Sequence, residues 1–523
     1  MTFTTRKIHE PFGRAQGQPP SQWLLALKKI MPYLLKCGGL FVGLYGKWKI
    51  RHEEDERKAA RIRILKKIAV ILVAILVGVL ILAGTVKALV QLRIVTLQTF
   101  LSIAGADLPA DENGFTSILL LGAGDKDHDG TDLTDAMMVV SLDPWKTRSA
   151  VMLSLPRDLY MLSTEKMGKG RINELYRNYK GYLRAKEQMN AAVASMLAMK
   201  ELGSELGRKL GLEIHHVVKV DFTAFVEGVN ALGGVDITVP YDIVDPEYPG
   251  PNYTFETFEI RAGPQHLDGE TALKYARSRH TTSDFGRSGR QQKLLTALVE
   301  KARSQGVARS PGTITQLLKT LSEHVETTMS FAEILGAARL GDRVDRKNII
   351  NMHLNIETGI ETPFISPGGF LYAPPRDQFD GASVLLPVSI PEFPVTWKQL
   401  QTFVRFVTLN RVTLLSKPQV HILNAGAKTG AARLLGNELI RYGFEDVETD
   451  NASDDRRYPL KLPATVVIAR TAADEGYAEF FADLLGLLTG PLHPSVASEK
   501  QGQVTIVLGT DYAYTPLQDL MRE

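Results

Sequence analysis

Ser117-Ile-Leu-Leu-Leu-Gly122 opens a series of three apolar runs that decides the fold of this chain. The second run is Ala136-Met-Met-Val-Val-Ser-Leu142, and the third is Ser149-Ala-Val-Met-Leu-Ser-Leu155. Each run is nearly continuous, which is typical of strands buried on both faces of a sheet. The turn-forming stretch Asp143-Pro-Trp-Lys-Thr147 joins the last two runs. The sequence therefore predicts a central sheet in the part of the chain that begins near residue 112.

Helical patterns alternate with further strand-like runs after residue 155. The patterns predict a helix-rich stretch at Tyr182–Leu210, a strand at His216–Val220, a helix from Phe222, a turn at Gly233-Gly234, a strand at Val235–Val239, and helices at Arg290–Arg303, Ile314–Val325 and Phe331–Leu340. Strands interleaved with helices indicate an α/β layer architecture.

A second, smaller α/β unit follows a Pro- and Gly-rich stretch at 357–395 that we expect to be irregular. Its predicted strands are Val420–Asn424, Val466–Ala469 and Val504–Leu508, with helices at Ala431–Tyr442 and Tyr477–Leu488 between them. Gly443 is a suitable C-terminal stop for the first of these helices. The unit has about 105 residues, which lies within the usual size range of a domain.

An uncharged apolar run, Ile68–Val86, precedes the whole α/β region. At about 1.5 Å per residue a helix of this length crosses a hydrocarbon core of about 30 Å. The alternative is a buried helix of a soluble protein, but such helices seldom go five turns without a charged group. We therefore predict a single transmembrane helix at 68–86.

Charge is distributed unevenly about this run. Residues 1–67 hold 15 Lys and Arg against 5 Asp and Glu, whereas the remaining 456 residues hold 46 against 53, within a chain of 523 residues and net charge +3. The positive-inside rule places the basic segment in the cytoplasm and the bulk of the chain outside the cell membrane. The acidic body argues against nucleic acid as a partner. The single cysteine, Cys37, excludes a disulfide scaffold and a cysteine-built metal site.

An acidic loop separates the first two runs and carries Asp125, Asp127, Asp129, Asp132 and Asp135. Carboxylates this dense repel one another, so a divalent cation is a natural partner, although a solvated acidic loop is the alternative. Asp125-x-Asp127-x-Asp129-Gly130 copies the start of a calcium-binding loop. Such a loop needs Glu at its twelfth position, which is Ala136 here, so that interpretation fails.

Arginines gather in Arg277-Ser-Arg-His-Thr-Thr-Ser-Asp-Phe-Gly-Arg-Ser-Gly-Arg-Gln291. If extended, Arg277 and Arg279 point to one side, and Arg287, Arg290 and Gln291 have the spacing of one helix face. Asp284 fits a helix cap or an ion pair with Arg287. Arg157 stands where the third strand ends, and Arg171 precedes Ile172-Asn173. Guanidinium groups bind phosphate bidentately, so these residues and the acidic loop suggest a Mg²⁺–pyrophosphate site rather than ordinary charged surface.

These residues resemble the LytR-CpsA-Psr (LCP) family over about residues 112–345. The motifs that carry the resemblance occur in this order: Ser117-Ile-Leu-Leu-Leu-Gly122, Thr134-Asp135, Ser154-Leu-Pro-Arg-Asp158, Arg171-Ile-Asn173, Gly233-Gly-Val-Asp236, Leu267-Asp-Gly-Glu-Thr-Ala-Leu273, Tyr275-Ala-Arg-Ser-Arg279 and Asp284-Phe-Gly-Arg287 with Arg290-Gln291. The tail from Val420 to Asp511 is similar, more loosely, to the LytR C-terminal domain.

The resemblance implies a central mixed sheet flanked by helices and an enzyme on the outer membrane face. Such enzymes are phosphotransferases that move a glycopolymer from undecaprenyl pyrophosphate to peptidoglycan through a phosphodiester link. By the same resemblance Asp125 and Asp135 would hold Mg²⁺ or Mn²⁺, although the other aspartates of the loop leave open which two bind the ion. Asp284 would orient an arginine or act as the base. The pyrophosphate would be held by Arg157, Arg171, Arg277, Arg279, Arg287, Arg290 and Gln291, with Asp284, Arg157, Arg277 and Arg279 as the catalytic set. The polyprenyl tail would lie in an apolar channel, which Ala191–Leu202 would help to line.

The resulting division of the chain is a cytoplasmic basic segment (1–67), the transmembrane helix (68–86), a stalk (87–111), the catalytic domain (112–345), an irregular extension (346–416) and a LytR C-terminal-like domain (417–523). Two other functions stay open at this point. One is a polyprenyl-pyrophosphate phosphatase, in which water replaces the peptidoglycan acceptor. The other is a non-catalytic envelope-binding or regulatory membrane protein.

Overall fold

A computed structural model of the chain describes residues 107–125, 130–250, 254–278, 284–307, 323–357, 368–388, 395–454, 459–491 and 503–521. These residues belong to one compact unit, Leu101–Glu523. The predicted transmembrane run Ile68–Val86 and the basic segment before it lie outside the described residues. Among the helices that are described, none is both long enough and apolar enough to cross a membrane.

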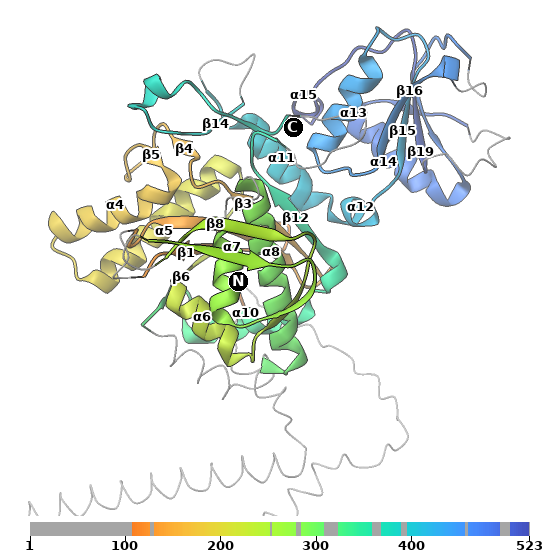
Figure 1. Ribbon diagram of the computed structural model, residues 1–523. Coiled ribbons are helices and arrows are strands. Elements are labelled where there is room, and N and C mark those ends of the chain that lie inside the picture. The colour runs from red at the N-terminus through yellow and green to blue at the C-terminus, as the bar shows by residue number, and fades with distance from the viewer. Residues whose placement is uncertain are drawn as a thin grey trace, which may run out of the picture. The chain divides into compact units, whose positions relative to one another are not determined.

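The central sheet has six strands in the order β11-β6-β1-β2-β3-β12 (Figure 1). The three apolar runs form its middle as β1 (Thr116–Ala123), β2 (Thr134–Asp143) and β3 (Ser149–Leu155), paired antiparallel. β6 (His216–Val220) and β12 (Ile349–His353) add parallel to β1 and β3, and β11 (Val325–Thr327) adds antiparallel to β6. The predicted mixed α/β sheet is confirmed.

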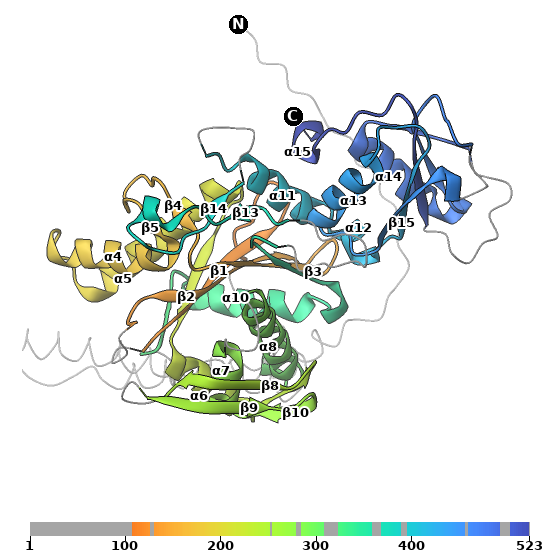
Figure 2. The same ribbon diagram turned by 45° about the horizontal axis from the view of Figure 1, so that its top comes forward.

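Helices cover both faces of this sheet, which explains why the strands read as continuous apolar runs. α4 (Ile172–Ala185) and α5 (Ala191–Leu210) share a core with Leu119, Leu121 and Val139 on one face. On the other face α10 (Phe331–Arg343) packs against Ile118 and Leu142 through Leu340. Figure 2 shows α10 and α8 on the opposite side of the strands from α4 and α5.

The predicted helix-rich stretch after residue 182 is in fact two helices. α4 starts ten residues earlier than the pattern indicated, and the chain breaks at 186–190 before α5. Asn190 caps α5, its side chain accepting a hydrogen bond from the Val193 N–H at 2.9 Å. A capping side chain of this kind satisfies an amide at a helix start, which fixes the break between the two helices.

A smaller layer completes the region around the central sheet. It holds α6 (Phe222–Ala231), α7 (Gly269–Arg277), the ribbon of β7 (Val235–Val239) with β10 (Gly263–Leu267), and the hairpin of β8 (Ile243–Pro249) with β9 (Phe255–Ile260). The predicted turn before β7 is confirmed, because Gly233 and Gly234 have φ angles of 72° and 85°. Such positive φ angles favour glycine.

The long helix α8 (Asp284–Ser304) joins that layer to the sheet. Gln292, which is 2% exposed, donates hydrogen bonds from Nε2 to the Met152 carbonyl of β3, the Ser154 hydroxyl and the Met352 carbonyl of β12, at 2.9 to 3.1 Å. These bonds hold the first half of α8 against two strands at once. The predicted helix Ile314–Val325 lies largely outside the described residues, and its last residue begins β11.

The C-terminal unit contains the predicted elements and two strands that were not predicted. Its sheet has the order β16-β15-β19-β17-β18, built from β15 (Val420–Asn424), β16 (Val447–Asn451), β17 (Val466–Ala469), β18 (Leu488–Thr489) and β19 (Val504–Leu508). α13 (Ala431–Arg441) and α14 (Glu475–Leu485) pack on it, and α15 (Leu517–Leu520) is the last of the described helices. Strand β16 is polar and mostly exposed, so its sequence gave no apolar signal.

The region between the two sheets is irregular but contains short elements. Its described part holds the ribbon of β13 (Leu371–Tyr372) with β14 (Leu386–Pro387), followed by α11 (Lys398–Leu409) and α12 (Arg411–Ser416). Arg411 is 1% exposed and donates from Nη1 to the Ser141 carbonyl of β2 at 3.0 Å. Its guanidinium lies 4.0 Å from the centre of the Phe115 ring. These contacts attach the extension directly to the central sheet.

Candidate functional site

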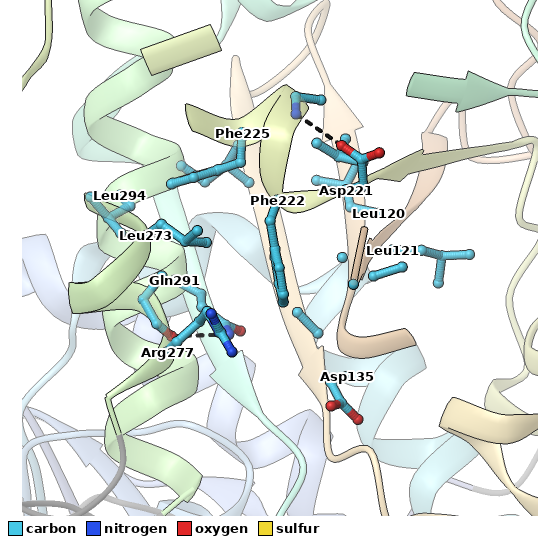
Figure 3. Close-up of a pocket in the computed structure, with 18 of the residues that line it drawn as sticks. Leu120, Leu121, Asp135, Asp221, Phe222, Phe225, Leu273, Arg277, Gln291 and Leu294 are labelled. Carbon is cyan, nitrogen blue, oxygen red and sulfur yellow. Dashed lines mark hydrogen bonds between the residues drawn. The ribbon is translucent and has the colours of Figure 1, made fainter. Parts of the chain in front are cut away.

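A cavity of about 830 Å³ opens where β1 ends and β2 begins, and Figure 3 shows this cavity. Its walls come from the sheet, from α6 and α8, and from the β8–β9 hairpin. Apolar side chains supply most of the lining: Leu120, Leu121, Met137, Met138, Phe222, Phe225, Leu273, Leu294, Leu295 and Leu298. A cavity of this volume is in the usual range for a ligand-binding site.

Charged and polar side chains converge on the same cavity from separate elements. Asp135 comes from β2, Arg157 follows β3, Arg277 ends α7, and Arg287 and Gln291 lie one turn apart on α8. The sequence predicted all five as site residues, and the structure brings them together. An apolar cavity with a group of guanidinium groups suits a ligand that has a phosphate head and a hydrocarbon chain.

Arg277 is held in place by aromatic side chains. Its Nη1 donates to the Tyr248 hydroxyl at 3.2 Å, and its guanidinium carbon lies 4.3 Å from the centre of the Phe222 ring. Figure 3 shows Phe222 between Arg277 and the sheet. Stacking on an aromatic face limits the rotamers of the arginine without using its remaining N–H donors. Arg277 is therefore oriented before any anion arrives.

Arg157 and Asp135 form a second charged group at the cavity. Nη1 of Arg157 lies 3.7 Å from one oxygen of Asp135, and its Nε lies 3.6 Å from Asp158. The other oxygen of Asp135 accepts a hydrogen bond from Asn173 Nδ2 at 2.9 Å. The side chain of Asp135 is still 46% exposed, so both groups can meet a ligand.

Two of the predicted phosphate-binding arginines have other partners. Arg171 contacts Glu174 and lies 3.6 Å from Asp158, and it does not line the cavity. Arg290 is 5% exposed and donates to the carbonyls of Tyr275, at 2.9 Å, and Ser278. It therefore fixes the end of α7, where Arg277 stands. This arrangement supports a positioning role for Arg290 instead of contact with a phosphate.

Four other predicted site residues cannot be placed at the cavity by their side chains. Arg279, Asp127 and Asp129 lie outside the described residues. Asp284 is the first residue of α8, and its side chain is not described. The segment Ala191–Leu202, expected to line the apolar channel, contributes none of the residues around this cavity, because α5 lies on the opposite face of the sheet. The apolar lining comes from α6 and α8 in its place.

Asp132 of the acidic loop is neutralised by two lysines. Lys219 Nζ lies 2.7 Å from Oδ1 and Lys180 Nζ lies 2.8 Å from Oδ2. Burial alone would raise the pKa of Asp132, but the hydrogen bonds from Lys180 and Lys219 outweigh it and hold the pKa below its usual value. Because its charge is already balanced, Asp132 is a poor candidate for a metal ligand. These two contacts leave Asp125 and Asp135 as the better candidates for metal ligands among the described aspartates of the loop.

Asp125 and Asp135, the pair expected to hold a divalent ion, have different surroundings. Asp125 Oδ1 accepts a hydrogen bond from the Thr223 N–H at 3.0 Å, and its carboxylate lies close to Asp221 and His324. Asp135 lies at the cavity beside Arg157. Carboxylate oxygens are the donors that Mg²⁺ and Mn²⁺ prefer, so the residue types fit such an ion.

Sequence reasoning missed Asp221, Phe222, Tyr248 and His324. Asp221-Phe222 directly follows β6, a strand parallel to β1, and ligands in α/β sheets tend to bind at the carboxyl ends of parallel strands. That rule offered a signal for this pair. No sequence signal pointed to Tyr248 or His324, because their positions at the site depend on how the β8–β9 hairpin and β11 pack.

Models of two protein families match the chain. The LytR_cpsA_psr family matches residues 95–372, more than half of the chain. The family described as LytR cell envelope-related transcriptional attenuator matches residues 417–512. The two matches fall on the central sheet with its cavity and on the C-terminal sheet, respectively.

Curated relatives and solved structures with similar chains are also found. The chain is 26% identical to the cell wall biosynthesis protein LcpA of Corynebacterium glutamicum, over 79% of this chain and 77% of that protein. It is 30% identical to the polyisoprenyl-teichoic acid–peptidoglycan teichoic acid transferase TagV of Bacillus subtilis, over 50% of this chain and 60% of that protein. The crystal structure of B. subtilis TagV has 24% identity and a TM-score of 0.39, over 56% of this chain and 96% of that one. The structure of TagT bound to LIIa-WTA has 22% identity and a TM-score of 0.39, over 57% of this chain and 91% of that one.

Proposed function

The chain belongs to the LytR-CpsA-Psr family, and from this premise we propose that it is a membrane-anchored extracytoplasmic phosphotransferase. In this proposal it moves a glycopolymer from an undecaprenyl-pyrophosphate carrier to peptidoglycan through a phosphodiester link. The observation that carries the proposal is one cavity lined both by Arg157, Arg277 and Arg287 and by apolar side chains from α6 and α8. Such a cavity matches a diphosphate with an isoprenoid tail.

The names of curated relatives support an enzyme of this class. TagV and TagT of B. subtilis are named polyisoprenyl-teichoic acid–peptidoglycan teichoic acid transferases, and LcpA is named a cell wall biosynthesis protein. The predicted family and class of enzyme agree with these names. The membrane anchor at Ile68–Val86, with residues 1–67 in the cytoplasm, remains part of the proposal.

In the proposed reaction an acceptor hydroxyl attacks the phosphorus that carries the glycan. A phosphodiester to the acceptor forms, the P–O bond to the second phosphate breaks, and polyprenyl phosphate leaves. Arg157, Arg277 and Arg287 stabilise the negative charge that grows on the departing phosphate, because they already face the cavity. Asp125 and Asp135 would hold Mg²⁺, which supplies further positive charge to the phosphate oxygens. Asp284 would orient an arginine or accept the proton of the hydroxyl.

Product analysis tests this proposal. We expect the purified full-length protein in detergent to release polyprenyl phosphate from a lipid-linked oligosaccharide only when Mg²⁺ or Mn²⁺ is present. With peptidoglycan added, the oligosaccharide should become covalently attached to it through a phosphodiester. Release of free phosphorylated oligosaccharide at the same rate with and without peptidoglycan would identify a phosphatase. No release under any condition would support the non-catalytic alternative.

Phe255 offers a second test, of the apolar part of the cavity. Its side chain lines the cavity at the β8–β9 hairpin but is 70% exposed, so Phe255→Ser should leave the fold intact. Burial of a phenylalanine against a hydrocarbon chain is worth about 1.5–3 kcal/mol, which is roughly a 10- to 100-fold change in KM. We expect this rise with a long-chain polyprenyl substrate and little change with a short-chain analogue. An equal rise for both substrates would contradict tail binding at Phe255.

A further inference from the structure

Asp125, Asp221 and His324 meet at one edge of the central sheet. One ligand atom from each, a carboxylate oxygen or an imidazole nitrogen, lies within 4.8 Å of the other two. Ligands on opposite sides of a divalent ion are about 4–4.5 Å apart, given metal–ligand bonds of about 2.0–2.2 Å. Small side-chain rotations would therefore bring all three atoms to one ion.

The backbone places these three residues through strand pairing. Asp221 follows β6, and Asp125 comes two residues after β1, which runs parallel to β6 with Gly122 opposite Val220. His324 immediately precedes β11, whose Val325 also pairs with Val220. The Asp221 N–H donates to the His324 carbonyl at 3.2 Å. Three adjacent strands thus fix the backbone next to each of the three residues.

Both carboxylates are held by backbone N–H groups. Asp221 Oδ1 accepts from the Ala224 N–H at 2.9 Å as the cap of α6, and Asp125 Oδ1 accepts from the Thr223 N–H at 3.0 Å. Asp221 Oδ2 lies 2.7 Å from His324 Nδ1. One end of α6 therefore orients both carboxylates toward the imidazole.

Charge distinguishes this group from the other carboxylates nearby. Asp132 is neutralised by Lys180 and Lys219, and Asp135 lies beside Arg157. Within the described part of the chain, neither Asp125 nor Asp221 forms an ion pair with a lysine or an arginine. Asp221 is only 8% exposed, and repulsion between two carboxylates so close together favours a cation.

We propose that Asp125, Asp221 and His324 form a divalent metal site in which His324 is a direct ligand. An imidazole ligand favours a transition metal such as Mn²⁺ over Mg²⁺. Asp221 also lines the cavity (Figure 3), so an ion held here would face the place where the arginines converge. The proposal concerns the ion of the proposed transferase, but it assigns Asp221 and His324 in addition to Asp125 and does not require turnover.

Mn²⁺ binding to the full-length protein in detergent, without substrate, tests the site. We expect His324→Gln and Asp221→Asn to weaken Mn²⁺ binding by roughly tenfold or more, as loss of a ligand does. Asparagine can still cap α6, so the second variant keeps the helix start. His266→Gln is the matched control, because His266 pairs with Asp236 on the surface of the same domain and should leave binding unchanged.

Electron spin echo spectroscopy of bound Mn²⁺ supplies a readout that a merely structural histidine would not affect. We expect a nitrogen coupling from the imidazole in the unmodified protein and its loss in His324→Gln. No nitrogen coupling in the unmodified protein, or unchanged affinity in a folded His324→Gln variant, overturns the proposal. Asp135→Asn completes the set, since a loss of affinity there with none in His324→Gln would place the ion between Asp125 and Asp135. These binding measurements do not depend on transfer activity. The proposed metal site and the proposed transferase function can therefore be contradicted independently of each other.

Discussion

Replacing Arg277 with alanine is expected to lower the rate of glycopolymer transfer by about 10²- to 10³-fold, with a small change in KM. Arg277 is already oriented by Tyr248 and Phe222, and it faces the cavity from the end of α7. A preorganised charge of this kind acts mainly on the transition state, in which negative charge moves onto the departing phosphate. Steady-state kinetics with a lipid-linked oligosaccharide would measure the change.

Two further variants make this result specific. Arg277→Lys keeps the positive charge but loses the planar fork, so we expect it to recover only part of the rate. Arg177→Ala removes an exposed arginine from α4, on the other face of the sheet, and should leave the rate unchanged. Equal rates for Arg277→Ala and the unmodified protein would show that the reaction does not take place at this cavity.

Replacing Lys219 with methionine is expected to destabilise the protein by about 3 kcal/mol. Lys219 is 6% exposed, and its Nζ lies 2.7 Å from Asp132 and 2.6 Å from Glu326. Burial alone would lower the pKa of Lys219, but these acidic partners and Tyr176 raise it above its usual value. Removing the amine leaves Glu326 without the lysine that pairs with it, and it leaves Asp132 with Lys180 alone. Both carboxylates are partly exposed, which keeps the cost near the lower end of the usual range.

Denaturant unfolding would measure the free energy of unfolding of this variant. Adding Glu326→Gln to Lys219→Met should restore part of the lost stability, because the partly buried charge of Glu326 is then gone. Lys417→Met, which breaks the exposed pair with Glu445, serves as the control and should cost less than about 1 kcal/mol. If Lys219→Met costs no more than this control, the buried network does not stabilise the acidic loop.

Much of the fold could be predicted from local pattern, because the strands that were found are continuously apolar. β3 and β6 begin and end at the predicted residues. What the pattern could not show was the break before α5, since lysine, glutamate and glutamine at 186–188 are common in helices, and the break is seen only in the positive φ of Gln188 and the cap at Asn190. Strand β16 was missed because its polar residues pair through the backbone with β15 and bury little apolar surface.

The site could be predicted only as far as residue type and spacing reach. Arg287 and Gln291 share a helix face, and that face meets the cavity as expected. Arg290 lies beside them in the sequence, yet it contacts the carbonyls at the end of α7, because the neighbouring helix packs on that side of α8. Asp221 and His324 are 103 residues apart in the sequence, and only the pairing of β6 with β11 brings them together.

The anchoring of α8 by Gln292 affects how the charged groups of the site are held before substrate binds. Its bonds to β3 and β12 fasten α8 to the central sheet, directly after Gln291 and five residues after Arg287. We therefore expect Arg287 and Gln291 to keep the same spacing when a ligand binds, because folding of the chain has already placed them. Each round of catalysis then begins with an electrostatic field that is already in place.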